Sequence, residues 1–516
     1  MVYFNHIVSM FANLINSHML NALNSLERKL YQIIIIRLDG DNIQSKEYQN
    51  KIFNLVEKGI GGFIIFGGAK DEIQSFINKI QTIAEIPLFI ASDIERGVGQ
   101  QIQGTTNFPC QMAVAAAINR NKPEDVSILE NAIKAVADEA IDIGINMPLI
   151  PVLDVNQNPD NPIICTRAFS DNPEDVAWFG SKYIRILEDS GLISCAKHFP
   201  GHGDTAIDSH ISLPVISKSK DDLMKTDLMP FVKSIEAGAG SIMIGHLKVP
   251  ALDSKPASLS RKIITDLLKK ELGFNGLIIT DALNMSALKD FGNVPVECIK
   301  AGVDILLHPV DADMTVKELL SAIESKEIIE DQIDSTLERI IKAKERFSNI
   351  KKPDVNYKAH AFISEQISDM SITLVKSKPD ILPLSSDKDA NIVFAGDDDI
   401  YKSSLLKNHF NSEFHKVAIG QTLNSELLII AIFTSVAAWK GSSGISDEEK
   451  RKIIELIKQA KSSIVISFGS PYVLRHFEEA DILIAAYEPS EQAQMAVIKC
   501  LKGEIEFSGK LPVKIF

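Results

Sequence analysis

Short apolar runs alternate with longer amphipathic stretches along the first two thirds of the chain. The runs are continuous in Ile, Val, Leu and Phe, which is typical of parallel strands buried on both faces of a sheet. Strands are predicted at 33–38, 62–66, 88–91, 146–155, 192–196, 241–245, 277–280 and 304–307. Helices are predicted at 47–58, 71–84, 124–143, 173–190, 221–238, 260–272, 295–301, 315–325 and 329–347. About eight strand–helix units in succession favour a (β/α)₈ barrel of the TIM type over an open doubly wound sheet.

A second pattern of strands and helices follows residues 348–358, which we interpret as a linker. Its predicted strands are 372–375, 392–394, 427–433, 463–468 and 482–486, and its predicted helices lie near 361–370, 446–461 and 490–502. This pattern predicts a smaller α/β (αβα) sandwich domain. We therefore expect an N-terminal extension over 1–30, a barrel over 31–347, the linker, and a C-terminal domain over 359–516. Residues 1–26 are expected to form an amphipathic helix on the outside of the barrel.

The composition is that of a globular protein, with 45% hydrophobic and 24% charged residues. The net charge of −14 argues against nucleic-acid binding, which depends on Lys and Arg to neutralise phosphates. The five Cys residues are scattered and predict no disulfide framework, which favours a reducing compartment. Neither a secretory signal pattern nor a membrane-spanning stretch is recognisable. We therefore expect a cytoplasmic protein, with export as the less favoured alternative.

Polar side chains recur at the carboxyl ends of the predicted barrel strands. They are Asp93, Asp154, Lys197, His198, His246, Asp281 and His308. In a (β/α)₈ barrel the carboxyl ends of the strands form the rim that carries the active site. We therefore expect the functional site at this rim, with His246 and Asp154 as supporting residues only.

The densest group of titratable residues is the segment 197–210, Lys-His-Phe-Pro-Gly-His-Gly-Asp-Thr-Ala-Ile-Asp-Ser-His. Pro200 and Gly201 exclude a regular helix, so a loop after a buried strand is expected. A metal site is the alternative, because the His and Asp residues are possible ligands, but their spacing is not that of zinc sites, and no metal is expected. The segment resembles the signature of family 3 glycoside hydrolases, in particular the β-N-acetylglucosaminidase branch, whose loop ends in Asp-Ser-His.

Asp281 directly follows the predicted strand 277–280 and the sequence Gly-Phe-Asn-Gly at 273–276. By position alone it is equally a residue that caps the next helix. The stretch resembles the family's nucleophile motif, which is Gly-Phe-x-Gly, three apolar residues and Ser/Thr-Asp. The resemblance implies that Asp281 attacks the anomeric carbon and forms a glycosyl-enzyme ester, as a retaining glycosidase requires.

Asp208 and His210 end the loop. An Asp close to a His can accept the proton on one ring nitrogen and leave the other nitrogen facing a leaving group. In the β-N-acetylglucosaminidase branch an Asp-His pair of this form is the general acid/base, and Asp208-Ser209-His210 matches it. The resemblance implies that His210 protonates the glycosidic oxygen and then activates water.

Four further residues are expected to hold the sugar through charged hydrogen bonds. They are Asp93, Arg167, Lys197 and His198. Asp93 matches the Asp of the family's Asp-x-Glu-Gly-Gly motif, from which this chain departs at Arg96 and Gln101, where Gly and Arg are usual. Arg167 matches the Arg of the family's Arg-Ser-Phe-Gly motif. The alternative for Arg167 is a salt bridge to a carboxylate at the rim.

The second domain offers Glu488 and Glu491. In the β-glucosidase branch of the family, a Glu from this domain is the general acid/base. Here both residues are interpreted as acidic residues at the start of a helix, where the helix dipole favours them. A structural second domain is therefore expected.

Together these resemblances imply a retaining exo-β-N-acetylglucosaminidase that acts on terminal β-linked N-acetylglucosamine, most simply in muropeptide fragments of peptidoglycan. Neither a metal nor an organic cofactor is implied. The alternatives are a β-glucosidase or β-xylosidase, a non-catalytic sugar-binding module, and transfer of the sugar to phosphate instead of water. The expected partner is the carbohydrate substrate, without nucleic acid or a membrane span, for a monomer or weak homo-oligomer.

Overall fold

The computed structural model describes residues 19, 22–209, 212–384, 390–397, 404–410, 412–417, 426–436 and 440–516. The helix expected over 1–26 lies almost entirely outside the described residues. Of that segment, Met19 and Ala22 are buried against the core of the first domain. In the part of the chain that the structure describes, no helix combines the length and apolar character needed to cross a membrane.

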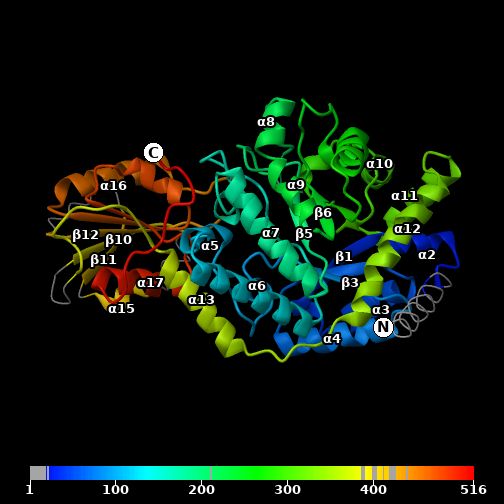
Figure 1. Ribbon diagram of the computed structural model, residues 1–516, viewed down its shortest axis with the longest axis horizontal. Helices are drawn as coiled ribbons and strands as arrows, with labels where there is room; N and C mark the ends of the chain where they lie inside the picture. Colours follow the sequence, from blue (N-terminus) through cyan, green and yellow to red (C-terminus); the bar gives the residue numbers. More distant parts are fainter. Residues whose placement is uncertain are drawn as a thin grey trace.

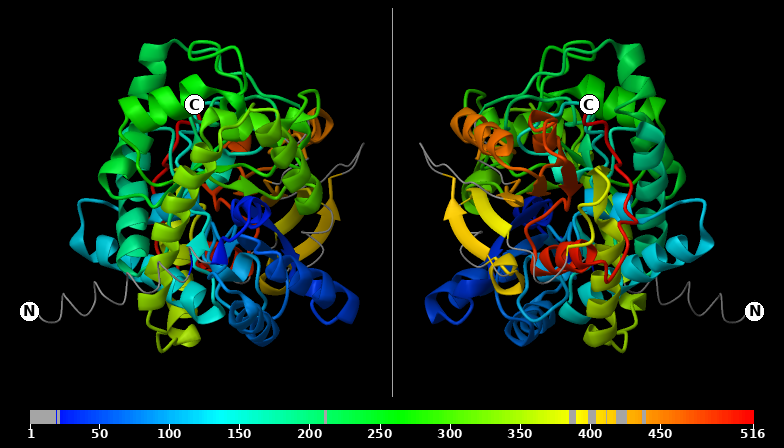
Figure 2. Two further views of the ribbon diagram at one scale, coloured as in Figure 1. Left: turned by 90° about the vertical axis from the view of Figure 1, so that its right-hand side faces the viewer. Right: turned by 90° about the vertical axis from the view of Figure 1, so that its left-hand side faces the viewer.

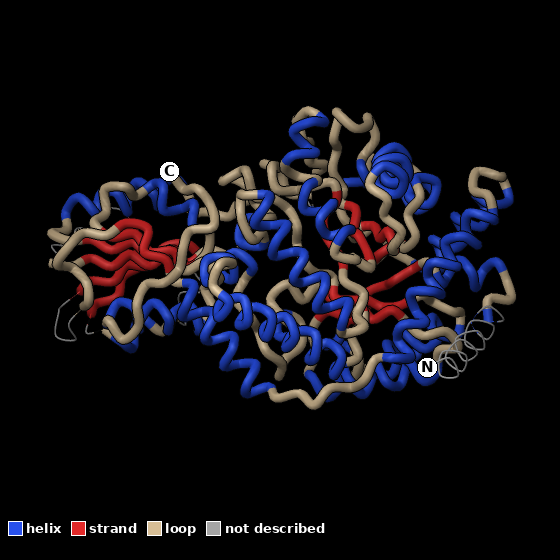
Figure 3. The backbone as a smooth tube through the Cα atoms, in the orientation of Figure 1, coloured by secondary structure: helices blue, strands red, loops and turns tan. Residues whose placement is uncertain are grey.

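The first domain is the expected TIM-type barrel, whose strands lie inside a layer of helices (Figure 3). Its strands are β1 (Ile34–Asp39), β2 (Gly62–Phe66), β3 (Phe89–Ser92), β4 (Met147–Pro148), β5 (Cys195–Phe199), β6 (Ser241–Ile244), β7 (Leu277–Thr280) and β8 (Leu306–Leu307). Two parallel sheets, ordered β4-β3-β2-β1-β8 and β5-β6-β7, make up the wall. Single parallel bridges, Val152 to Lys197 and Ile279 to Ile305, join these sheets at two seams. The ring of strands is therefore closed in sequence order.

The helices of the barrel surround the strands (Figure 2). They are α2 (Leu26–Gln32), α3 (Lys46–Glu57), α4 (Lys70–Ile83), α6 (Pro123–Ile143), α7 (Pro173–Asp189), α8 (Lys220–Lys225), α9 (Met229–Glu236), a π-helix (Lys262–Glu271), α10 (Val294–Ala301), α11 (Ala312–Glu324) and α12 (Glu330–Lys344). Local sequence sets their ends. Asn172 caps α7 by accepting from the amides of Glu174 and Asp175, and α6 ends at Gly144 with a φ of 98°.

The helix expected over 221–238 is divided into α8 and α9. Pro230 stands at the start of α9, where its missing N–H costs no hydrogen bond. Within a continuous helix the same ring would clash with the carbonyl group of Thr226, one turn earlier. The expectation of one helix was therefore wrong.

Strand β5 lies three residues further along the chain than expected, so that Lys197 and His198 belong to the strand. The Lys197 amide donates to the carbonyl of Pro151, and the Leu153 amide donates to the carbonyl of Lys197. These bonds close the seam between β4 and β5. Barrel closure therefore draws polar residues into the strand, although the apolar run before them was the stronger local signal.

The second domain is a six-stranded sheet with helices on both faces, to the left of the barrel in Figure 1. The sheet order is β11-β10-β12-β13-β14-β9, and only β9 is antiparallel to its neighbour. The strands are β9 (Thr373–Lys376), β10 (Ala390–Gly396), β11 (Ser412–Lys416), β12 (Leu428–Phe433), β13 (Ser463–Phe468) and β14 (Ile482–Ala485). The helices are α13 (Tyr357–Ser371), α15 (Leu406–His409), α16 (Asp447–Gln459) and α17 (Glu491–Lys502).

The two domains share a hydrophobic core. Helix α5 (Gln111–Ala117) of the first domain contributes Met112 and Ala113 to the cluster that also contains Tyr472 and Tyr487 of the second domain. The Tyr472 hydroxyl also accepts a hydrogen bond of 2.9 Å from the side chain of Asn156 in the barrel. These contacts hold the second domain against the barrel.

Candidate active site

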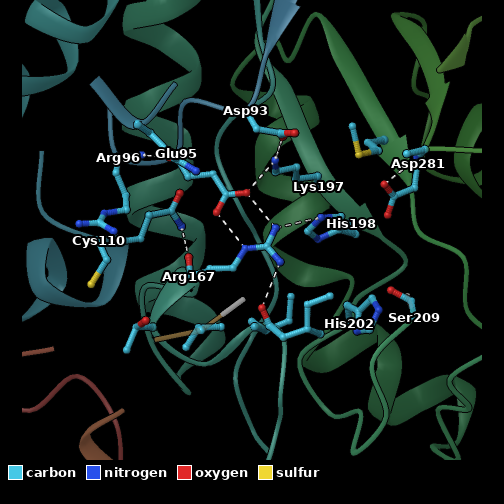
Figure 4. A pocket seen from close by; sticks show the side chains of 18 of the residues that line it. Asp93, Glu95, Arg96, Cys110, Arg167, Lys197, His198, His202, Ser209 and Asp281 are labelled. Carbon is cyan, nitrogen blue, oxygen red and sulfur yellow. Dashed lines mark hydrogen bonds and ion pairs between the residues drawn. The ribbon is translucent and has the colours of Figure 1, made fainter. Parts of the chain in front are cut away.

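A cavity of about 710 Å³ opens at the carboxyl ends of the barrel strands, as the rim pattern predicted. Five of the expected site residues line it: Asp93, Arg167, Lys197, His198 and Asp281 (Figure 4). The second domain supplies part of the wall through Thr434, Ser435, Val436, Tyr487, Glu488 and Pro489.

Charged groups on one wall of the cavity form a continuous network. The Lys197 ammonium lies 2.6 Å from an Asp93 oxygen and 2.8 Å from a Glu95 oxygen. Arg167 donates to both oxygens of Glu95, at 2.9 and 2.8 Å, in the bidentate geometry that suits a guanidinium and a carboxylate. Glu95 therefore forms ion pairs with two cations. From the sequence it was known only as the Glu of the motif that begins at Asp93.

The network stays ionised despite its burial. Burial alone would raise the pKa of the Glu95 carboxyl, but the positive charges of Arg167 and Lys197 outweigh it and hold that pKa well below its usual range. Burial would lower the pKa of Lys197, yet Asp93 and Glu95 raise it above its usual value. A rigid, charged wall of this kind suits vicinal sugar hydroxyls, which both donate and accept hydrogen bonds.

His198 is oriented by a buried carboxylate. Its Nδ1 lies 2.7 Å from an oxygen of Asp154, which follows the β4 segment and is fully buried. The other Asp154 oxygen accepts from the main-chain amides of His198 and His202 at 3.3 and 2.7 Å. Nδ1 of His198 therefore carries the proton, and its Nε2 faces Arg167 at 3.4 Å.

Asp281 lies immediately after β7 and reaches the cavity. One of its carboxylate oxygens accepts from the Ala282 amide at 2.8 Å, which fixes the side chain. The His246 ring contacts the Ala282 carbonyl at 3.2 Å and the Ser258 hydroxyl at 2.9 Å, so it supports the turn that carries Asp281. This supporting position matches the expectation for His246.

The far end of the β5 loop is described only up to Ser209. Asp208 is 2% exposed and is not among the residues that line the cavity, whereas Ser209 lines it. His210 lies outside the described residues. Among the described residues no group of three or more His, Cys, Asp or Glu side chains has a geometry that could hold a metal ion.

The second domain was expected to be structural only, and the position of Glu488 on the cavity wall corrects this expectation. Glu488 precedes α17 instead of belonging to its first turn, where Glu491 lies as expected. One Glu488 oxygen contacts Arg96 at 2.9 Å and accepts from the Cys110 amide at 3.0 Å, and the other accepts from Ser490. The signal in the sequence was Arg96 itself, an unusual charge in a position where the family motif has Gly.

Comparison with known proteins decides the family. The family model described as "Glycosyl hydrolase family 3 N terminal domain" matches residues 25–343, which is most of the barrel. The chain belongs to glycoside hydrolase family 3. The family implied by the motifs is therefore confirmed, and so is the barrel followed by a second α/β domain that the pattern of strands and helices predicted.

The relatives of this family 3 chain include enzymes of the expected branch. A β-hexosaminidase A of Pseudoalteromonas piscicida is 34% identical over 63% of this chain, and the match covers only 60% of that enzyme. A β-N-acetylglucosaminidase/β-glucosidase of Cellulomonas fimi is 24% identical over 89% of both chains. Among solved structures, the family 3 β-N-acetylglucosaminidase of Paenibacillus sp. FPU-7 superposes with a TM-score of 0.82, 26% identity, and coverage of 95% of this chain and 99% of that one. A β-glucoside phosphorylase, 24% identical with a TM-score of 0.86, shares the fold.

Proposed function

We propose that the chain is a retaining exo-β-N-acetylglucosaminidase with Asp281 as its nucleophile. The observation that carries this proposal is the position of Asp281, which borders the same cavity as the network of fixed charges. The carboxylate attacks the anomeric carbon and forms a glycosyl-enzyme ester, which water then hydrolyses. Asp93, Arg167, Lys197 and His198 bind the hydroxyl groups of the terminal sugar.

The general acid/base in this proposal is His210, oriented by Asp208. The motif Asp-Ser-His supports the assignment, as does the placement of Ser209, between them in sequence, on the cavity wall. His210 gives a proton to the leaving oxygen in the first step. Neutral after that transfer, it takes a proton from the attacking water in the second.

The proposed substrates are terminal β-linked N-acetylglucosaminides, in particular muropeptide fragments handled in the cytoplasm. The names of the relatives support the sugar, and the few, buried and unpaired cysteines among the described residues agree with a reducing compartment. In the proposed mechanism the chain's own carboxylate and imidazole perform both steps, with water as the acceptor.

Replacing Asp281 tests the core of the proposal. Wild type should hydrolyse an aryl β-N-acetylglucosaminide faster than an aryl β-glucoside, and Asp281→Ala should lose about 10⁴-fold in kcat. Initial rates with and without inorganic phosphate separate water from phosphate as the acceptor. A preference for the glucoside, or undiminished turnover by the variant, would contradict the proposal.

A second test separates His210 from Glu488 as the general acid. Glu488 is the alternative because it lines the cavity from the second domain, but an ion pair with Arg96 and hydrogen bonds from the Cys110 amide and Ser490 occupy both of its oxygens. His210→Ala should therefore slow substrates with poor leaving groups by about 100-fold and activated aryl substrates far less. If Glu488→Gln shows that leaving-group dependence and His210→Ala does not, the acid belongs to the second domain.

A further inference from the structure

His202 has a ring nitrogen that is buried at the cavity and lacks a partner among the residues that the structure describes. The residue follows β5, is 2% exposed and lines the cavity. Its Nε2 forms no hydrogen bond with any described residue. A buried polar atom without a partner costs free energy, and such atoms are rare in folded proteins. We therefore expect a group of a bound ligand to form the missing hydrogen bond with Nε2.

Neighbouring side chains determine which kind of group would bind. The Thr205 hydroxyl donates its only proton to the His202 carbonyl at 3.1 Å, so its oxygen is left to accept from His202 Nδ1 at 2.9 Å. Asn161 supports this arrangement by donating to the same carbonyl at 3.0 Å. With the proton on Nδ1, the Nε2 atom presents a lone pair and acts as an acceptor.

The ring also stays neutral. Burial lowers the pKa of His202 to about 4, although the negative charge of Asp154 opposes this shift. At neutral pH the imidazole therefore does not serve as a proton donor toward the cavity. A complementary ligand group must be an N–H or O–H donor.

The position of His202 in the cavity with Asp281 indicates which donor group of the substrate would meet it. Asp281 and His202 line the same cavity. Figure 4 draws both on the side of the view away from Glu95 and Arg96. A sugar whose anomeric carbon meets Asp281 presents the substituent of carbon 2 next to that carbon. The charged wall of Lys197 and Arg167 remains for the more distant hydroxyl groups.

We propose that His202 Nε2 accepts a hydrogen bond from the donor on carbon 2 of the bound sugar, which is the acetamido N–H of an N-acetylglucosaminide. This inference rests on the proposed function and adds a residue that recognises the substituent distinguishing that substrate. Hydrogen bonds to the substituent of carbon 2 strengthen in the transition state of glycoside hydrolysis, so the contact should contribute to kcat as well as to KM.

The experiment compares two substrates across a set of variants. Aryl β-N-acetylglucosaminide carries a donor on carbon 2, and aryl 2-deoxy-β-glucoside carries none. His202→Phe should lower kcat/KM about tenfold on the first substrate and leave the second nearly unchanged. His202→Gln, whose amide oxygen can accept, should recover part of the loss. Thr205→Val should reproduce a weaker form of the same selective loss, and Thr205→Ser, which keeps the hydroxyl, should behave as wild type.

The outcomes separate this inference from the proposed function. Equal losses on both substrates, or a loss that His202→Gln does not reduce, would overturn the role of His202 while leaving the proposed function intact. A wild-type enzyme without activity on the N-acetylglucosaminide would contradict the proposed function itself. Thermal unfolding of each variant identifies any that fails to fold, and the milder Thr205 pair then still tests the contact.

Discussion

At the scale of single residues, Glu95 is the central charge of the cavity wall. Its carboxylate neutralises both Lys197, which is 2% exposed, and Arg167. If Glu95 lost its charge, Lys197 would keep its contact with Asp93, whereas Arg167 would lose its bidentate carboxylate partner. Removing one partner of a buried ion pair is costly because the other partner is left without compensation.

Glu95→Gln should therefore destabilise the protein by about 3 kcal/mol and raise KM for the sugar substrate. Urea unfolding and initial-rate kinetics measure the two effects. Glu330→Gln is the matched control, because Glu330 pairs with Lys29 at a site where it is 50% exposed, and it should cost less than about 1 kcal/mol. Equal losses of unfolding free energy at the two positions would show that the buried network stabilises the protein no more than a surface ion pair does.

The same network predicts a dependence of stability on acid. The pKa of Glu95 is lower in the folded than in the unfolded protein, where it is about 4.3. Its contribution is therefore complete above the unfolded pKa and is lost as the pH falls through the folded value. The difference in unfolding free energy between wild type and Glu95→Gln should be constant from pH 7 to about pH 5 and shrink below about pH 4. A difference that grows toward low pH would contradict this assignment.

Single residues also show which parts of the site could not be predicted from the sequence. The motifs placed Asp93, Arg167, Lys197, His198 and Asp281 around one cavity, and the structure brings them there. His202 was grouped only with possible metal ligands, because its significance depends on a ring nitrogen that folding leaves without a partner among the described residues. Glu488 was taken for a helix-start residue, since its partner Arg96 lies almost four hundred positions earlier in the chain.

At the scale of elements, helix α12 is tied to the barrel by one buried carboxylate. Asp304 accepts from Arg339 of α12 through Nε at 3.0 Å, and its other oxygen accepts from the Ile278 amide of β7 at 2.9 Å. The helix that closes the barrel is thus linked to the strand that carries Asp281. This contact lies at the opposite end of β7 from the cavity.

Asp304→Asn should lower stability by about 3 kcal/mol because it removes the charge that compensates Arg339. The activity of each folded molecule should be retained, since the substitution lies away from the cavity. Asp334→Asn on the same helix is the control, because Asp334 is 48% exposed and pairs only at the surface. Urea unfolding midpoints, measured together with specific activity, distinguish this structural role from a catalytic one.

Sequence patterns predicted the strands and helices better than they predicted the contacts of single residues. Continuous apolar runs located β2 and β7 at their observed bounds, because buried parallel strands leave a strong local signal. The predictions failed where pairing between strands or a single residue outweighs the local hydrophobic pattern. Strand β5 is extended through Lys197 and His198 by pairing across the seam, and Pro230 divides a region whose periodicity alone favoured one helix.

At the scale of the whole molecule, the second domain completes the cavity through the contact of Arg96 with Glu488. A double-mutant cycle of Arg96→Met and Glu488→Gln should give a coupling energy of about 1–3 kcal/mol in unfolding free energy. Each single variant should also raise KM, and the double variant should be less impaired than the sum of the two. Additive effects would mean that the two side chains act independently despite their 2.9 Å contact.

The shared wall has a consequence for the synthesis of the enzyme. Residues that line the cavity are spread from Arg37 to Pro489, so the barrel and its proposed nucleophile are made well before the last part of the wall. Domains generally fold in the order in which they leave the ribosome. A growing chain therefore carries Asp281 in an unfinished cavity, and the proposed hydrolytic activity should appear in full only after the segment that contains Tyr487, Glu488 and Pro489 has folded against the barrel.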